Sequence, residues 1–343
     1  MDYKYKALFK YEFKKIVWLF GAMFLFMLLY AVSHNNTVSS EINNILSYDD
    51  SLNIDFLIFE PCFLFFYTAF IYVLVYLQFS DGFNKLWHSL PFTSKEVIRI
   101  KLLTGIFAIS IFFLCIFIIM TVTYFNYAEV YKDVLTALNI NPNIISIFYI
   151  IKTVITIFSV YIFIYFFTVF IQYIVGNCLS GIVLSLLLIY APILILAGFD
   201  ALHILSDNVI KLIFLVFPHY YDVTNDLFYS SYNQIGNLQI YVANNIVSRF
   251  PAAGIFYYII LALISLFLVF KVAASSKWIE QSNPFSKKWI VNIFKLAFVI
   301  DFAMIGAALF YDNIFEKILL SLVLALIGYV IAVIIIKRQG VNS

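Results

Sequence analysis

Charged residues are scarce in this chain. Of its 343 residues, 12% are Asp, Glu, Lys or Arg and 64% are hydrophobic, whereas about a quarter of the residues in a soluble domain are charged. So few polar side chains do not cover the apolar surface of such a chain, which excludes an ordinary soluble fold and predicts that lipid is part of its solvent. The formal net charge of +2 argues neither for nor against nucleic acid, and we expect no nucleic-acid partner.

Motifs of catalysis are also missing. The 11 glycines are scattered along the chain and form no Gly-x-x-x-x-Gly-Lys loop, which excludes ATP hydrolysis through a phosphate loop of this chain. Neither a His-Glu-x-x-His motif nor a Gly-x-Ser-x-Gly motif occurs. The sequence therefore predicts that the chain is not an enzyme by itself and that it binds no cofactor.

Cysteine and histidine are too few and too dispersed to indicate a metal site. They are Cys62, Cys115 and Cys178, and His34, His88, His203 and His219. No Cys-x-x-Cys spacing occurs and the cysteines lie in or beside apolar runs, so we interpret them as buried apolar thiols. A metal site formed by the two later histidines with neighbouring Asp residues is disfavoured, because their spacing matches no ligand pattern.

Apolar sequence, in contrast, is abundant and falls into eight long runs. They cover residues 16–32, 56–78, 102–124, 144–175, 179–199, 253–270, 291–311 and 314–336. A helix needs about 20 apolar residues to cross a bilayer. The runs predict an all-α polytopic membrane protein, a single transmembrane domain over residues 1–343 with about eight transmembrane helices. The break at Tyr311-Asp312-Asn313 is short, so the last two spans are the least clearly separated.

The basic residues indicate the orientation. If the N-terminus is cytoplasmic and the spans alternate, most Lys and Arg residues lie on the cytoplasmic side: before the first run, in segment 80–101, around segment 271–295 and after the last run. The exceptions are Lys132, Lys152, Lys211, Arg249 and Lys317. Because cytoplasmic loops are enriched in Lys and Arg, we expect both termini in the cytoplasm.

The N-terminal residues 1–15 carry an amphipathic pattern. Apolar side chains recur at helical spacing, and three lysines form a separate stripe; the two sets are Tyr5, Leu8, Phe9, Phe13 and Ile16, and Lys6, Lys10 and Lys14. This pattern predicts an interfacial helix with its lysines near anionic lipid. The alternative is a merely basic tail beside the membrane.

Segment 80–101, between the second and third runs, predicts a short helix, a turn and a long helix. Pro91 stops the short helix near Leu90. Thr93 and Glu96 have the spacing of a capping box, so the next helix is expected to begin near Thr93 and to continue into the third span.

The largest outer segment, 200–252, includes an apolar stretch at 212–217 that is too short to span and a region at 225–245 rich in Asn and Tyr, which predicts an ordered polar cap.

Asp301 lies near the middle of the seventh run. An unpaired charge there costs several kcal/mol, so we expect the side chain to face protein or water, near Lys295, or to be protonated. A functional role and a structural polar contact between helices remain open.

The run Leu90-Pro91-Phe92-Thr93-Ser94-Lys95-Glu96-Val97-Ile98-Arg99-Ile100-Lys101 resembles the segment before the third span in permease subunits of ABC-2-type transporters. The layout around it is similar too: an N-terminal elbow helix (1–15), a six-span core (16–272) with an inner coupling region (80–101), and an extracellular region (200–252). Two additional spans (273–343) resemble the eight-span permeases of Gram-positive peptide-export and immunity systems, such as phenol-soluble modulin exporters.

The resemblance implies an exporter that works by alternating access in the plasma membrane of a Gram-positive bacterium. Two membrane subunits, as a homodimer or heterodimer, would sit on two ATPase subunits that hold ATP and Mg. The cargo would be hydrophobic or amphipathic, more plausibly peptide than sugar, because few polar side chains line the spans. The ATPase contact would be made by Phe83, Leu86, Trp87, His88, Leu90 and Pro91. A simpler interpretation is that Phe83 and Trp87 anchor the chain at the lipid interface.

Two other classes of function compete with this one. A proton-coupled secondary transporter would use Asp301 and would need no ATPase. A polytopic lipid-modifying enzyme would need Asp, Glu or His clustered near one membrane face. The inner loops supply mainly Lys, with Asp81, Glu96 and Glu280 scattered, which disfavours the enzyme.

Overall fold

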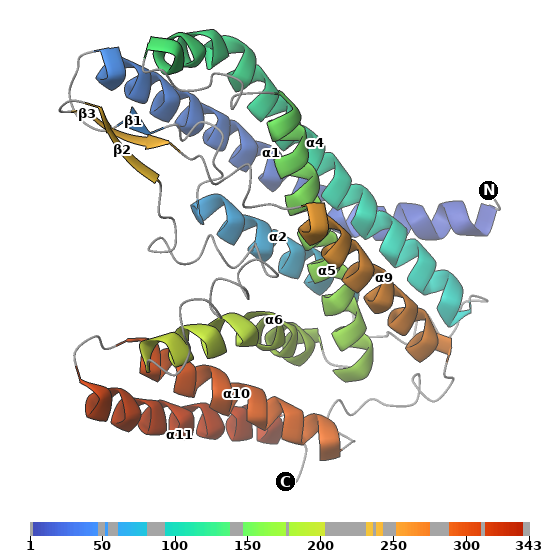
Figure 1. Cartoon of the computed structure of the whole chain (residues 1–343). Coiled ribbons are helices and arrows are strands. Elements are labelled where there is room, and N and C mark those ends of the chain that lie inside the picture. The colour runs from blue at the N-terminus through green and yellow to red at the C-terminus, as the bar shows by residue number, and fades with distance from the viewer. Residues whose placement is uncertain are drawn as a thin grey trace. The chain divides into compact units, whose positions relative to one another are not determined.

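The structure is a computed structural model that describes residues 3–46, 52–53, 61–80, 93–137, 147–175, 178–202, 231–235, 238–242, 252–274, 288–309 and 313–338. These parts of the chain contain eight helices and three short strands (Figure 1). The helices are α1 (Tyr3–Leu46), α2 (Pro61–Phe79), α4 (Ser94–Ala137), α5 (Ile147–Val175), α6 (Cys178–Ala201), α9 (Ala252–Ala274), α10 (Lys288–Ala308) and α11 (Ile314–Arg338).

Each of the eight predicted runs overlaps one of these helices over its described residues. Six helices contain a stretch that is long and apolar enough to cross a membrane: Tyr5–Ser33, Lys95–Val130, Val154–Val175, Ile255–Val272, Lys288–Ala308 and Ile314–Arg338. Two further apolar stretches, Tyr67–Phe79 in α2 and Cys178–Pro192 in α6, are shorter. The prediction of a helical multi-pass membrane protein is confirmed, and the spanning role of α2 and α6 stays a prediction.

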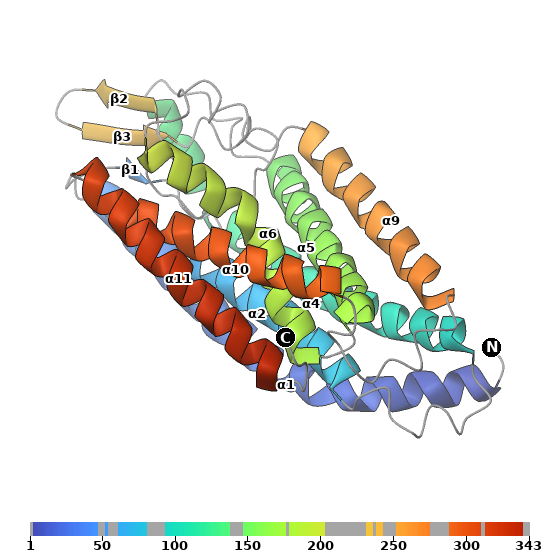
Figure 2. The same ribbon diagram turned by 90° about the horizontal axis from the view of Figure 1, so that it is seen from below.

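The N-terminal helix differs from the prediction in its continuity. Residues 1–15 were expected to form a separate elbow helix, but α1 runs without a break for 44 residues and bends between its first turns and the rest (Figures 1 and 2). The amphipathic pattern itself is confirmed: Leu8 and Ile16 are buried, and Lys6, Lys10 and Lys14 are exposed. A stripe of lysines fits a continuous helix as well as a separate one, so the sequence pattern did not distinguish them.

A small sheet adds β-structure to the predicted all-α fold. Strands β2 (Ser231–Ile235) and β3 (Leu238–Val242) pair antiparallel, and β1 (Leu52–Asn53) pairs parallel with β3, with Leu52 opposite Ile240. Strands β2 and β3 lie in segment 200–252, which was predicted to be extracellular, and within the region 225–245 where a polar cap was expected.

The chain divides into two compact units. The first, made of Met1–Ile71, Leu102–Ile162 and Leu215–Ile260, has an aromatic core. Tyr67 of α2 packs against Phe112 and Phe113 of α4 and Tyr161 of α5, with ring centroids 4.0, 4.9 and 4.9 Å apart. On α1, Phe13 lies 6.2 Å from Phe107 of α4. Much of the phenylalanine and tyrosine in these helices therefore serves packing between them.

The second unit, made of Tyr72–Lys101, Phe163–Phe214 and Leu261–Ser343, has its core where α6, α10 and α11 lie side by side (Figure 2). Glycines set the close contact: a methyl group added to Gly306 would lie 2.7 Å from Ser321 Cα, and one added to Gly328 would lie 2.6 Å from the Phe298 carbonyl oxygen. The predicted break before α11 is confirmed. Asn313 begins that helix by accepting a 3.0 Å hydrogen bond on Oδ1 from the Phe315 amide, as an N-cap does.

Candidate functional site

The start of α4 forms the capping box that the sequence predicts. The Thr93 amide donates to Glu96 Oε2 at 2.8 Å, the Thr93 hydroxyl donates to the same oxygen at 2.9 Å, and the Glu96 amide donates to Thr93 Oγ1 at 3.3 Å. These bonds satisfy backbone donors that the first helical turn leaves without partners. The helix that leads from segment 80–101 into the third span therefore has a defined first residue, Ser94.

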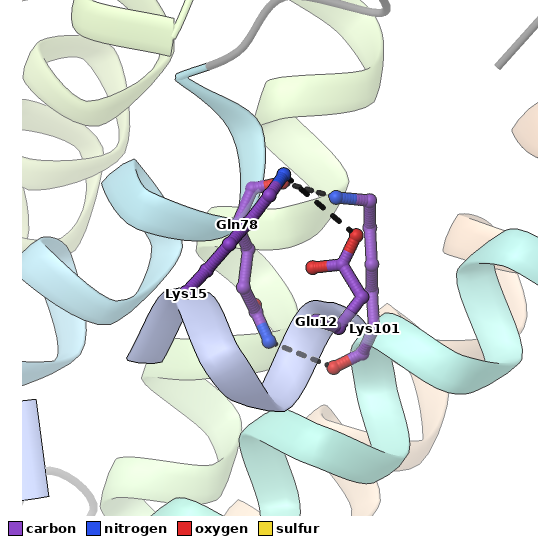
Figure 3. Close-up of polar contacts among 4 residues, drawn as sticks. All are labelled: Glu12, Lys15, Gln78 and Lys101. Atoms are coloured by element: carbon purple, nitrogen blue, oxygen red, sulfur yellow. Dashed lines mark hydrogen bonds and ion pairs between the residues drawn. The ribbon is translucent and has the colours of Figure 1, made fainter. Parts of the chain in front are cut away.

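The last turn of α2 is joined to the second turn of α4 by reciprocal hydrogen bonds (Figure 3). Gln78 donates from Nε2 to the Lys101 carbonyl oxygen at 2.9 Å, and Lys101 donates from Nζ to the Gln78 carbonyl oxygen. Both side chains are buried. Because α2 ends at Phe79, the ammonium group lies at the negative end of that helix, where a cation is favoured.

Tyr165 of α5 completes this polar site, which we call the clamp (Gln78, Lys101 and Tyr165). Its hydroxyl lies 3.0 Å from Gln78 Oε1 and 3.0 Å from the Lys101 carbonyl oxygen. Tyr165 is fully buried and Lys101 is 4% exposed. Lys101 Nζ also lies 4.8 Å from the centre of the Phe79 ring, within the range of a cation–π contact. The clamp thus ties together three helices that are distant in sequence.

The last turn of α5 and the first residue of α6 contact the same end of α2. Gln172 of α5 donates from Nε2 to the Cys178 carbonyl oxygen at 2.9 Å, and Cys178 Sγ lies 3.8 Å from the Tyr76 carbonyl oxygen. The Phe79 and Tyr173 rings meet edge to face at 5.5 Å. α5 ends at Val175 and α6 begins at Cys178, so the ends of both helices lie close to the end of α2 that carries Gln78.

The predicted ATPase-contact residues lie outside the described part of the chain. They are Phe83, Leu86, Trp87, His88, Leu90 and Pro91. What the structure describes are the two ends of the segment that carries them, and the clamp holds these ends together. Sequence reasoning missed the clamp residues. The only signals were Gln78 as a polar residue at the end of one apolar run and Lys101 as a charged residue at the start of the next.

Asp301 is placed in the interior, as expected, but without the expected neighbour. Its side chain is 1% exposed, and neither carboxyl oxygen has a hydrogen-bond partner among the described residues. Lys295 lies instead with Nζ 5.7 Å from the centre of the Tyr329 ring. The structure therefore favours the buried interpretation of Asp301 and not an ion pair with Lys295.

Other polar features of the helices are structural in character. On α1, Glu12 and Lys15 form a pair with Lys15 Nζ 4.0 Å from Glu12 Oε1 (Figure 3). On α11, Lys317 is buried and donates from Nζ to the Ala201 carbonyl oxygen at 2.5 Å, so it caps the end of α6. Lys317 is one of the five basic residues outside the cytoplasmic segments of the predicted topology. Its contact with the C-terminal end of α6 explains why a cation is favoured at this position.

Metal ligands do not gather in the part of the structure that can be described. No group of three His, Cys, Asp or Glu side chains suited to a metal ion occurs among those residues, and all four histidine side chains lie outside them. Cys115 and Cys178 are free thiols and half-buried, less enclosed than the sequence suggests.

Comparison with known proteins gives no relative. No family model, no curated protein and no solved structure matches the chain.

Proposed function

We propose that this chain is the membrane subunit of an ABC-2-type exporter, powered by a separate ATPase that docks on segment 80–101. The chain itself carries out no catalysis in this proposal. Two such subunits, identical or different, assemble with two ATPase subunits that bind ATP and Mg. The setting is the plasma membrane of a Gram-positive bacterium, with both termini in the cytoplasm.

The clamp is the observation that carries this proposal. A segment that receives force from a docked partner transmits it only if its ends are firmly connected to the membrane helices. Gln78 and Lys101 join those ends through buried hydrogen bonds, and Tyr165 connects them to α5. Buried polar groups with satisfied hydrogen bonds form rigid connections. A displacement of segment 80–101 would therefore move α2, α4 and α5 together.

The capping box fixes the C-terminal part of the same segment, where α4 begins. Thr93 and Glu96 hold the first turn of α4, so the direction of the chain entering the third span is set before it reaches Lys101. This arrangement supports a rigid connection between segment 80–101 and the third span. Thr93 and Glu96 belong to the run of residues that resembles ABC-2 permeases.

The cargo in this proposal is an amphipathic or hydrophobic peptide. The six candidate spans have mean hydropathies between 1.9 and 3.1, so they offer few polar groups to a hydrophilic solute. Export or immunity towards membrane-active peptides fits such a path, because the cargo is itself soluble in the bilayer.

Transport in inverted membrane vesicles tests the proposal. Vesicles that contain the chain and a P-loop ATPase that co-purifies with it are expected to take up a fluorescent amphipathic peptide only when ATP is present. Combined Phe83→Ala, Leu86→Ala and Trp87→Ala substitutions are expected to abolish ATPase binding and uptake. Phe148→Ala, an exposed aromatic on α5, is the matched control. Uptake without the ATPase, or full ATPase binding by the triple variant, would refute the proposal.

A proton-driven secondary transporter is the second candidate, and the buried position of Asp301 favours it. A carboxyl group inside a membrane protein is a common element of proton-coupled transport. This candidate predicts uptake driven by a pH gradient without ATP, and loss of that uptake in Asp301→Asn. Uptake that follows ATP and ignores the pH gradient would exclude it.

A further inference from the structure

Asp301 occupies the junction of α6, α10 and α11. Three residues before it, Phe298 contacts α11, where a methyl group added to Gly328 would lie 2.6 Å from the Phe298 carbonyl oxygen. Three residues after it, Met304 contacts α6, where a methyl group added to Gly198 would lie 2.5 Å from Met304 Sδ. Since a helix turns once in 3.6 residues, the side chain of Asp301 projects between these two contacts.

The contacts on either side of Asp301 are made by Phe298, Met304, Gly198 and Gly328, none of which has a charged or hydrogen-bonding side chain. The buried core of the same unit is also apolar and includes Leu187, Phe294, Ala297, Phe298 and Ala332. The glycine contacts bring the helices so close that an added methyl group would collide with the neighbouring helix. A carboxylate in such surroundings loses its hydration without receiving donors in exchange.

No charged group of the neighbouring helices compensates Asp301 in the described part of the unit. The titratable residues of these elements whose side chains are described are Cys178 and Tyr190 on α6, Lys288 and Lys295 on α10, Glu316, Lys317, Tyr329, Lys337 and Arg338 on α11, and Tyr165 and Tyr173 on the adjoining half of α5. The side chain of Asp200, also on α6, lies outside the described part. Lys295 lies over Tyr329, Lys317 bonds to Ala201, and Tyr165 bonds within the clamp. Neither carboxyl oxygen of Asp301 accepts a hydrogen bond from any of them.

We propose that Asp301 is a reversible proton-binding site that controls the packing of α6, α10 and α11. The packed junction holds the neutral carboxylic acid, because burial of the charged form costs several kcal/mol more. When the acid gives its proton to water, the carboxylate draws water into the junction and α10 separates from its neighbours. Proton binding then favours the packed state of the three helices, and proton release favours the separated state.

Infrared spectroscopy of the purified full chain in lipid nanodiscs tests the protonation directly. A protonated carboxylic acid absorbs apart from carboxylates and amides. At neutral pH we expect an acid band in the wild type that disappears in Asp301→Asn and in Asp301→Leu and persists in Asp133→Asn, which removes an exposed carboxyl group of α4. An unchanged spectrum in both Asp301 variants would overturn the proposal.

Hydrogen exchange tests the link to packing. As the pH is raised, the amides of α10 and α11 in the wild type are expected to exchange faster than in Asp301→Asn at the same pH, while the amides of α4 exchange equally in both. Equal exchange in α10 and α11 at every pH would overturn the proposal. Neither experiment needs an ATPase or a cargo, so a failure here is separate from a failure of the transport proposal. Using two substitutions keeps the test valid if one variant does not fold.

Discussion

Lys101 and Asp301 are almost equally inaccessible, at 4% and 1% exposed, and both belong to the second unit, yet their surroundings differ completely. Lys101 donates to the end of α2, lies against an aromatic ring and shares its own carbonyl oxygen with Gln78 and Tyr165. Asp301 lies between the contacts of Phe298 with Gly328 and of Met304 with Gly198, and it has no hydrogen-bond partner among the described residues. Buried polar groups with hydrogen-bond partners hold helices together. A buried polar group without partners lowers the stability of the folded protein, and its presence therefore indicates a functional role.

The largest effect on stability is expected from Lys101→Met. The substitution keeps the apolar stem but removes the ammonium group from the buried carbonyl oxygen of Gln78, and the loss of a hydrogen bond from a charged donor costs about 1.5–3 kcal/mol. Thermal unfolding in detergent measures it. Lys95→Met is the matched control, because Lys95 is exposed on the same helix. Equal melting temperatures for the two variants would contradict the assignment of the clamp.

Lys317→Met repeats this test at the other buried lysine. Its Nζ donates to the last residue of α6, so the substitution removes a cation from a helix C-terminus, a contact worth up to about 2 kcal/mol when partly buried. The same unfolding assay applies, with the exposed Lys337 changed to Met as the control. A variant as stable as this control would mean that the Ala201 contact does not stabilise the fold.

Tyr165→Phe removes one hydroxyl group from the clamp and leaves the ring in place. The expected loss is about 1 kcal/mol, the usual contribution of a hydrogen bond, and ATP-driven uptake should fall while ATPase binding stays intact. Tyr76→Phe is the control, since Tyr76 is 41% exposed. Undiminished uptake would show that the clamp has no part in transmission.

Asp301→Leu should have the smallest effect, or a favourable one. Replacing a buried polar group that has no partner by an apolar side chain is often neutral or stabilising. The melting temperature of the variant is therefore expected to match or exceed that of the wild type. A marked loss of stability would mean that Asp301 has a structural partner, and the contrast with Lys101 would disappear.

Local signals in the sequence predicted more of this fold than distant ones. The capping box depends on Thr93 and Glu96, which are neighbours on one helical turn, and the break before α11 depends on Asn313, so each is readable from a few residues. The apolar runs found the helices because apolar length is a property of each segment alone. A helix was predicted before the first apolar run, but its continuity with that run in α1 was missed, because the charge pattern does not depend on whether the chain breaks.

Long-range contacts decided what the sequence did not reveal. Gln78, Lys101 and Tyr165 form the clamp only when three helices pack, and nothing local to any of them specifies the other two. The pairing of Leu52 with Ile240 likewise joins strands from two distant loops. Asp301 was recognised because a charge inside an apolar run is conspicuous by itself, but its neighbours followed only from the packing of α10 on α6 and α11.

Thiol labelling tests most directly that segment 80–101 faces the cytoplasm, where an ATPase reaches it. In a chain whose Cys62, Cys115 and Cys178 are replaced by serine, Trp87→Cys introduces a single thiol for a membrane-impermeant maleimide. We predict that this thiol reacts in inverted vesicles, that added ATPase protects it, and that it does not react in intact cells. Reaction in intact cells would place the segment outside and contradict the account.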